Sequence, residues 1–227
     1  MRRLLLTLIL LAAAWSVQAQ DPFIFDMPND FSAIDTLPPA KKFKSLHMIG
    51  VSYSVNLSGV TSSPKLAQER IWTFKNFGVS YTYYHAMWDH LFNFGLVVGA
   101  KHGYEGFTSP HEGYGATYEV LEFPLLSQFK LDFSHFRLLL NLGPYYGYRL
   151  STDQEGGFNK YDQRHDYGVI AGVGLAVVIK PFELHIEGNY KYGLASIYHT
   201  YKYSDIYWMY TYPQNIVFSA SLHFHLW

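Results

Sequence analysis

The residues whose types and spacing could do chemistry are acids and histidines at alternate positions near the end of the chain. Glu183, His185 and Glu187 follow one another at intervals of two, and so do His223 and His225. Residues two apart on a β-strand point to the same face, so we expect each set to face one way. Imidazole and carboxylate groups on one face favour either a divalent metal site or a network in which histidine pairs with glutamate.

A second candidate for chemistry is a serine near a histidine, Ser109 and His111. Some small membrane barrels modify lipids with serine and histidine near the membrane surface. No nucleophile elbow and no acidic orienting residue accompanies this pair, which indicates ordinary loop residues. We therefore expect no catalytic residue, no cofactor and no metal, and keep a lipid-modifying enzyme as an alternative.

The elements that position these groups are segments of alternating apolar and polar residues. An apolar face backed by a polar face is typical of strands that have lipid outside and a polar lumen inside. We therefore predict an all-β fold, an eight-stranded antiparallel up-and-down transmembrane β-barrel. The expected strands are Leu46–Leu57, Phe74–His85, His90–Lys101, Tyr118–Leu131, Phe136–Leu150, Asp166–Ile179, Phe182–Leu194 and the C-terminal segment from about Ile216.

The connections between these strands alternate strictly in length. Short ones are expected at 87–89, 132–135 and 180–181, and long ones at 58–73, 102–117, 151–165 and 195–214. Bacterial barrels have short periplasmic turns and longer outer loops, so all four long connections are predicted to lie outside the cell. The sheet must close, because an open edge in hydrocarbon would leave backbone groups unsatisfied.

The N-terminal part of the chain predicts export. Arg2 and Arg3 precede an apolar stretch, Leu4 to Trp15, and small residues end at Ala19, as in a signal peptide. We expect 1–19 to be a signal peptide, 20–44 a periplasmic N-terminal arm and 45–227 a barrel in the bacterial outer membrane. The chain has no cysteine and hence no disulfide. Its formal charge of −1 does not indicate the concentrated basic surface that binding to nucleic acid requires.

Polar residues of the expected inner faces include acids and bases in similar numbers. Such a set predicts a paired polar network that fills the lumen, because an eight-stranded barrel is just wide enough for its own side chains. Water conduction is therefore not expected. The predicted lumen network consists of Glu122, Lys130, Arg137, Arg149, Glu183, His185, Glu187, Lys191, His223 and His225, with Lys101 and Asp166 on the same faces.

The last long connection is rich in aromatic residues with polar tips. These suit either an aromatic girdle at the membrane interface or a surface for a protein or glycan partner. The alternation over 201–203 further predicts strands that project beyond the membrane. The candidate partner-binding residues are Tyr201, Tyr203, Tyr207, Trp208 and Tyr210.

Several motifs between residues 118 and 194 resemble the PorT-like outer-membrane β-barrel family of Bacteroidota. They are 121–126 (LEFPLL), 143–148 (GPYYGY), 167–168 (YG), 172–175 (GVGL) and 190–194 (YKYGL). The resemblance implies a small exported barrel, and the family's namesake implies a link to type IX secretion. Independently, Pro124 lies inside a strand where it cannot donate a ladder hydrogen bond, so we predict a bulge there.

Together these features predict a small outer-membrane barrel with a structural or accessory role and extracellular aromatic loops. The expected partners are outer-membrane lipid and lipopolysaccharide, an envelope protein complex, and no nucleic acid. A subunit of a type IX-like secretion complex and a lipid-modifying enzyme are the alternatives. A soluble lipocalin-like barrel would need the opposite polarity, with the apolar faces inside.

Overall fold

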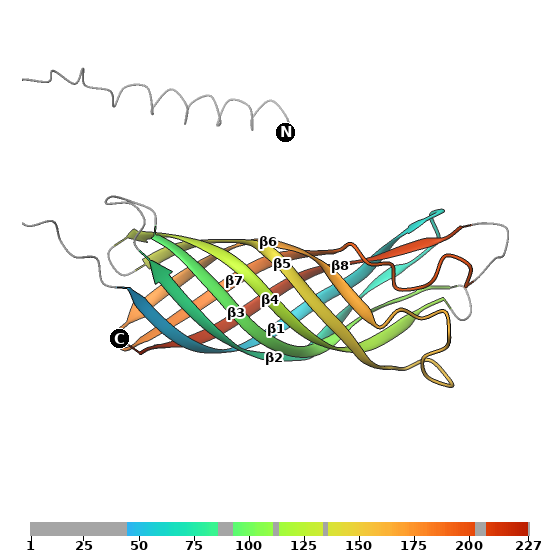
Figure 1. Ribbon diagram of the computed structural model, residues 1–227, viewed down its shortest axis with the longest axis horizontal. Helices are drawn as coiled ribbons and strands as arrows, with labels where there is room; N and C mark the ends of the chain where they lie inside the picture. The colour runs from blue at the N-terminus through green and yellow to red at the C-terminus, as the bar shows by residue number, and fades with distance from the viewer. Residues whose placement is uncertain (1–44, 86–92, 111–113, 134–135, 203–207, 227) are drawn as a thin grey trace, which may run out of the picture. The chain divides into compact units, whose positions relative to one another are not determined.

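The protein forms a closed antiparallel barrel in which each strand pairs with its neighbours in the sequence and β1 pairs with β8 (Figure 1). The computed structural model describes residues 45–85, 93–110, 114–133, 136–202 and 208–226. The predicted fold class is confirmed. The strands are β1 Leu46–Ser63, β2 Glu69–His85, β3 Asn93–Thr108, β4 Ala116–Phe133, β5 Phe136–Thr152, β6 His165–Ile179, β7 Phe182–Gly193 and β8 Tyr210–His225. The expected signal peptide and arm lie outside the described residues, as do His111, Tyr203 and Tyr207.

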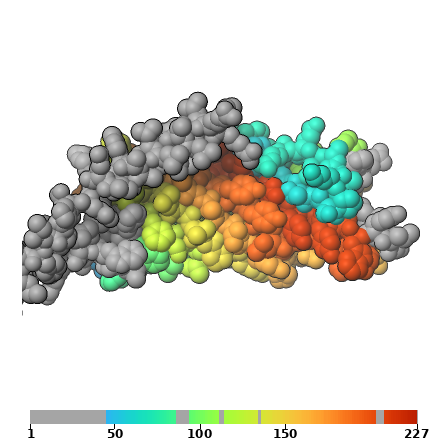
Figure 2. All heavy atoms as spheres, turned by 90° about the horizontal axis from the view of Figure 1, so that it is seen from above, coloured from blue at the N-terminus to red at the C-terminus, as the bar shows by residue number. Residues whose placement is uncertain are grey.

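The two faces of each strand differ sharply in polarity. On β7, Ile186 is 60% exposed on the outer wall, whereas Glu183 and His185 are 0% and 1% exposed in the lumen. Large apolar side chains are exposed around the outer wall, one face of which is visible in Figure 2. The predicted inside-out polarity is therefore present, with apolar groups facing outward. Within the described residues, no helix is long and apolar enough to cross a membrane.

Several strands are longer than predicted, mainly at the end that carries the long connections, here called the long-loop end; β4 also extends by two residues at its other end, to Phe133. β1 continues to Ser63 rather than Leu57, and β3 to Thr108 rather than Lys101. In these extensions the apolar side chains face inward: Val60 and Phe107 are buried, whereas the neighbouring Thr61 and Thr108 are exposed. The extensions thus have the polarity of a water-soluble protein, with apolar side chains inside and polar side chains outside. A prediction that requires apolar residues on the outer face therefore ends these strands too early.

Two local predictions are wrong. The pairing register is the same on both sides of Pro124, so no bulge is present there. Gly99 on the neighbouring strand lies beside the proline ring, and even a Cβ added to it would be in ordinary contact with the proline Cγ, at 3.6 Å. The ladder therefore accommodates the missing donor without an inserted residue. Tyr201 lies in a turn rather than a projecting strand, because β7 ends at Gly193 and the chain folds back toward the barrel.

The wall is irregular between β2 and β3. The register shifts by two residues between the pairs Arg70–Phe107 and Phe77–His102, and no ladder partners lie between them. Side chains satisfy the backbone of Tyr104 instead. The Asn76 Oδ1 accepts from the Tyr104 N at 2.7 Å, and the Thr73 Oγ1 donates to the Tyr104 O at 2.7 Å. We call this stretch the β2–β3 seam.

Candidate functional site

The lumen contains all ten residues predicted for its polar network, and they separate into two clusters. One lies near the end that carries the short connections, the short-turn end. The other lies closer to the long-loop end. An apolar layer of Leu126, Tyr145 and Ile170 occupies intermediate positions on β4, β5 and β6.

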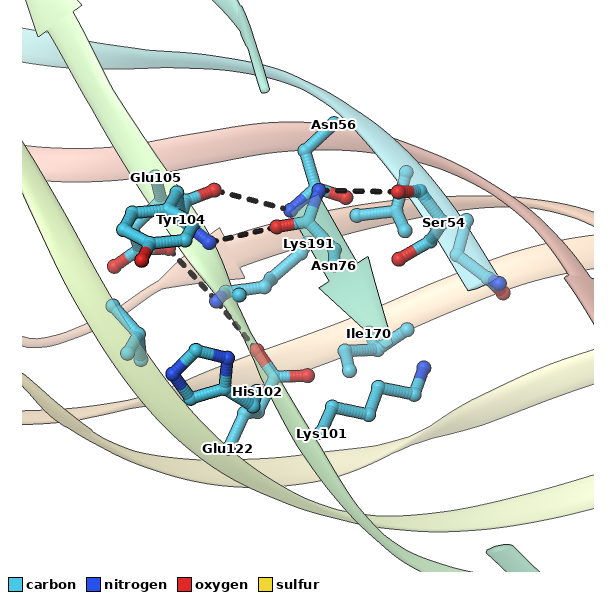
Figure 3. A pocket seen from close by; sticks show the side chains of 14 residues that line it. Ser54, Asn56, Asn76, Lys101, His102, Tyr104, Glu105, Glu122, Ile170 and Lys191 are labelled. Carbon is cyan, nitrogen blue, oxygen red and sulfur yellow. Dashed lines mark hydrogen bonds and ion pairs between the residues drawn. The ribbon is translucent and has the colours of Figure 1, made fainter. Parts of the chain in front are cut away.

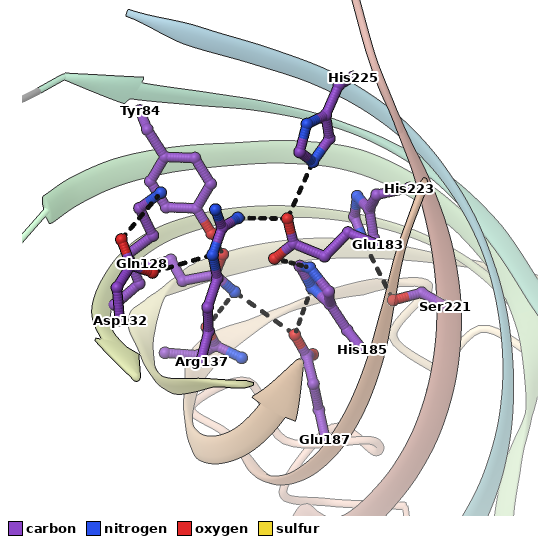
Figure 4. A network of polar contacts seen from close by, with 12 residues as sticks. Tyr84, Gln128, Asp132, Arg137, Glu183, His185, Glu187, Ser221, His223 and His225 are labelled. Carbon is purple, nitrogen blue, oxygen red and sulfur yellow. Dashed lines mark hydrogen bonds and ion pairs between the residues drawn. The ribbon is translucent and has the colours of Figure 1, made fainter. Parts of the chain in front are cut away.

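The glutamate-centred cluster lies near the short-turn end (Figure 4). Its centre is the buried Glu183, which bonds to the Arg137 guanidinium. The Glu183 Oε1 is 3.0 Å from the His185 Nε2, and its Oε2 is 2.9 Å from the His225 Nε2. Arg137 also reaches Asp132, with 2.8 Å between Nε and Oδ1. One carboxylate is thus shared by three basic side chains, which offsets much of the cost of burying it.

The remaining histidine and glutamate extend this cluster. The His223 ring stacks on the His185 ring with 4.0 Å between centroids, and its Nε2 is 3.0 Å from the Ser221 Oγ. The Glu187 Oε1 is 3.7 Å from the His185 Nδ1. Among the residues that the structure describes, no group of three or more potential ligands is arranged to hold a metal ion. The observed contacts are those of the other arrangement expected from the sequence, a network in which histidine pairs with glutamate.

The lysine-centred cluster has the opposite arrangement, with a cation at its centre. The Lys191 Nζ is 2.9 Å from the Glu105 Oε2, 2.5 Å from the Glu122 Oε2 and 3.9 Å from the Asp166 Oδ2. Arg149 is fully buried, and its Nη2 is 3.5 Å from the Asp166 Oδ1. Two cations are thus surrounded by three acids.

Glu105 is the member of this cluster that the predicted network missed. The predicted strand ended at Lys101, which placed Glu105 in a loop. Lys101, Gly103, Glu105 and Phe107 share one face of β3, so alternation continued beyond the expected end would have found it.

An aromatic cap covers the lysine-centred cluster at the long-loop end. The Tyr118 hydroxyl donates to the Tyr198 hydroxyl at 2.9 Å, and the Tyr198 hydroxyl donates to the Tyr114 carbonyl at 3.2 Å. Phe107 packs edge-on against Tyr114 with 5.0 Å between ring centroids. The Arg149 guanidinium lies 5.4 Å from the centre of the Tyr118 ring. Buried apolar residues complete the cap: Val60, Ala116, Val120, Ile197 and Met209.

The described lumen contains small cavities, among them two of about 50 and 40 Å³. Asn76, Glu105, Glu122 and Lys191 line the first (Figure 3), and Lys101 lines both. A buried water needs roughly 10–15 Å³ on this measure, so each cavity has room for only a few. Packed side chains thus occupy most of the lumen.

The described candidate loop residues are Tyr201, Trp208 and Tyr210, and the first two are in contact. Trp208 is 61% exposed and meets the Tyr201 ring edge-on at 6.1 Å between centroids. Tyr210 begins β8 and stacks on Tyr212. Tyr198, another tyrosine of the same connection, is buried in the aromatic cap.

Serine and histidine do meet an acid on the outer wall, at a place that the sequence did not indicate. The Ser151 Oγ donates to the Glu119 Oε2 at 2.7 Å, and the His102 Nε2 is 2.7 Å from the Glu119 Oε1. Both groups bond to the carboxylate, so the histidine is not positioned to take a proton from the serine. The Ser109 Oγ donates to the Ala67 carbonyl at 2.7 Å.

Comparison with known proteins adds little to this description. No protein-family model matches the chain, and no curated protein does. The resemblance to the PorT-like family therefore stays a prediction. Among solved structures, the outer membrane protein OprG from Pseudomonas aeruginosa is similar, with 11% identity and a TM-score of 0.45 over 81% of this chain and 97% of that one. A likeness at this level supports no functional argument.

Proposed function

We propose that this protein is a small barrel of the bacterial outer membrane with a filled lumen and a structural or accessory, non-enzymatic role. The observation that carries the proposal is the inside-out polarity of the wall: charged side chains such as Arg149 and Glu183 are buried along the axis, while apolar side chains cover the exterior. Lipid is the solvent that such an exterior requires.

Aromatic side chains at two levels of the outer wall support the location. Tyr81, Tyr83 and Phe94 lie toward the short-turn end, and Tyr146 and Tyr190 toward the long-loop end. Aromatic belts of this kind mark the two membrane–water interfaces. Fractionation tests the location: the mature protein should remain with outer membranes after a high-salt wash and leave them only in detergent. Recovery in the aqueous fraction without detergent would contradict it.

The aromatic cap and the two charged clusters support a barrel that does not conduct. Their side chains fill the axis, and the cavities between them hold only a few waters each. Planar bilayer recordings test this point, and we expect no steady ion current from the purified protein. Reproducible unitary conductance that disappears when the protein is omitted would refute a filled lumen.

Exposed aromatic residues at the long-loop end support a contact with a partner protein or glycan. Trp208 is the most exposed of the described candidates. Crosslinking in intact outer membranes followed by purification should recover envelope partners with the natural chain, and fewer with Trp208→Ala. Trp72→Ala provides the control, because Trp72 is also a half-exposed tryptophan but lies on β2. Recovery of secretion proteins would favour a role in such a machine, and recovery of the chain alone would refute the partner contact.

A further inference from the structure

Strand β2 contains a bulge that turns a lysine to the outer wall. Two of its residues, Phe74 and Lys75, lie opposite one residue of β1, Val55. Thr73 and Asn76 on either side are buried toward the lumen, whereas Phe74 and Lys75 are both exposed. Under strict alternation Lys75 would share the lumen face with Thr73. The extra residue of the bulge therefore places the lysine side chain outside.

Aromatic side chains surround this bulge. The Trp72 ring stacks on the Phe74 ring with 6.4 Å between centroids, and the two side chains are 52% and 57% exposed. The Tyr53 hydroxyl donates to the Phe74 carbonyl and so satisfies the backbone of the bulge. Exposed aromatic side chains near the end of an apolar wall mark a membrane–water interface. Lys75 therefore lies at the level of lipid headgroups, on the side of the long-loop end.

A second cation, Arg70, lies further toward the long-loop end of the same strand. Its Cγ packs over Gly59, where an added Cβ would come within 2.6 Å. Ser58 and Val60, on either side of this glycine, are buried toward the lumen. The face of Gly59 between them is therefore the outer one, and the arginine over it belongs to the outer wall.

These two cations lack a counter-charge among the residues that the structure describes. No ion pair there joins Lys75 or Arg70 to an acid. Glu119, an acid on the outer wall of β4, already bonds to His102 and Ser151. A cation beside hydrocarbon is costly unless an anion meets it at headgroup level. The unused bonding capacity of this surface is that of a donor, which suits a phosphate.

An apolar groove of about 390 Å³ lies on the membrane side of the bulge. Phe77 and Val79 on β2 line it, together with the small Ala100 on β3 and Leu121 on β4. Phe77 is two residues from Lys75, or about 7 Å along the strand. A phosphate at the bulge and a hydrocarbon chain in this groove can therefore belong to one amphiphile.

We propose that the outer face of the β1–β2 hairpin binds lipopolysaccharide through its phosphorylated headgroup. Lys75 and Arg70 donate hydrogen bonds to phosphate oxygens, and one acyl chain lies in the groove beside Phe77. Lipopolysaccharide is the phosphate-bearing glycolipid of the outer leaflet, the side on which the long-loop end is predicted to lie. The proposal rests on the outer-membrane location proposed above and on this orientation.

Native mass spectrometry of the delipidated protein in detergent tests the ligand. The protein would be titrated with lipid A, with the same lipid A after removal of its phosphates, and with phosphatidylglycerol. We expect one lipid A to be retained about tenfold more strongly than its dephosphorylated form, the ratio expected when one charge-assisted hydrogen bond is lost. Equal retention of these two would overturn the phosphate contact. Phosphatidylglycerol retained as strongly as lipid A would overturn the assignment to lipopolysaccharide.

Charge variants test the headgroup contact, each checked for its strand content by circular dichroism. Lys75→Gln and Arg70→Gln should each weaken lipid A retention about tenfold. Lys180→Gln is the control, because Lys180 is also exposed but lies in the connection at the short-turn end, and it should leave retention unchanged. Unchanged retention in Lys75→Gln would refute the headgroup contact.

A second pair of variants tests the acyl chain. Ala100→Phe should fill the groove and weaken lipid A retention, whereas Ala171→Phe, on the exposed wall of β6, should not. Equal retention in these two variants would refute the contact in the groove. A protein that needs no detergent would refute the membrane location instead, so the two failures are distinguishable.

Discussion

The two charged clusters of the lumen solve the same problem in opposite ways. In the lysine-centred cluster, Lys191 is surrounded by acids and covered by the aromatic cap, and its neighbour Arg149 is fully buried. In the glutamate-centred cluster, Glu183 is surrounded by Arg137 and two histidines, and the Arg137 side chain is 13% exposed. In both clusters the central charge is stabilised by the opposite charges around it. The clusters differ in how easily water can reach them and replace a lost partner.

The largest effect is expected from removing the central cation. Lys191→Met leaves three acids with Arg149 and the cross-strand Lys101 as the remaining cations, beneath the aromatic cap and beside a cavity with room for only a few waters. Breaking a buried ion pair costs about 3–5 kcal/mol, so we expect a loss of that size in the free energy of unfolding. Equilibrium urea unfolding in lipid vesicles, followed by tryptophan fluorescence, measures it.

Exposed Lys65→Met is the matched control for Lys191→Met and should change the unfolding free energy by less than about 0.5 kcal/mol. A loss in Lys191→Met no larger than in this control would show that water enters the lysine-centred cluster. The proposed contrast between the two ends would then fail.

A smaller effect is expected from Glu183→Gln at the short-turn end. The amide leaves Arg137 without its buried carboxylate, but Arg137 keeps Asp132, which is 44% exposed. Losing a hydrogen-bonded charged partner near water costs about 2–3 kcal/mol. The same urea unfolding measures the loss, with exposed Glu155→Gln as control. A loss greater than that of Lys191→Met would reverse the contrast.

A smaller loss of unfolding free energy is expected from removing one hydrogen bond of the aromatic cap. Tyr118→Phe removes the hydroxyl that donates to Tyr198 but keeps the ring beneath the cap. Losing one neutral buried hydrogen bond costs about 1 kcal/mol of unfolding free energy. Lipid-facing Tyr190→Phe, 43% exposed, is the control and should be nearly neutral in the same assay. Equal effects in both variants would indicate that the hydroxyl pair does not stabilise the cap.

The barrel could be predicted from the sequence because an apolar outer face alternates with a polar inner face, with period two, along the middle part of each strand. Residues such as Ile186 and His185 are adjacent in the chain yet belong to lipid and lumen. The pairing among lumen residues could not be predicted, because it depends on register and on which side chains reach across the axis. Lys191 on β7 forms ion pairs with Glu105 on β3 and Glu122 on β4. No local sequence pattern predicts these contacts.

The cap and the outer-wall site were missed for a different reason. Above the membrane the inward faces become apolar again, so Phe107 and Tyr198 read as loop or interface residues rather than as a core. His102, Glu119 and Ser151 lie far apart in sequence and become neighbours only when β3, β4 and β5 are adjacent. His102 and Ser151 fall in predicted loops, whereas Glu119 falls in the predicted strand Tyr118–Leu131 without a role.

The smallest expected effect tests whether the two clusters act independently. Leu126, Tyr145 and Ile170 lie at intermediate positions on their strands, and separated sites without shared partners add within about 0.5 kcal/mol. The double variant Lys191→Met/Glu183→Gln should therefore lose the sum of the two single losses. Lys101 lines both cavities and is the group that could join them. A coupling energy above about 1 kcal/mol would show that the lumen is one network, and its disappearance in Lys101→Met would identify the link.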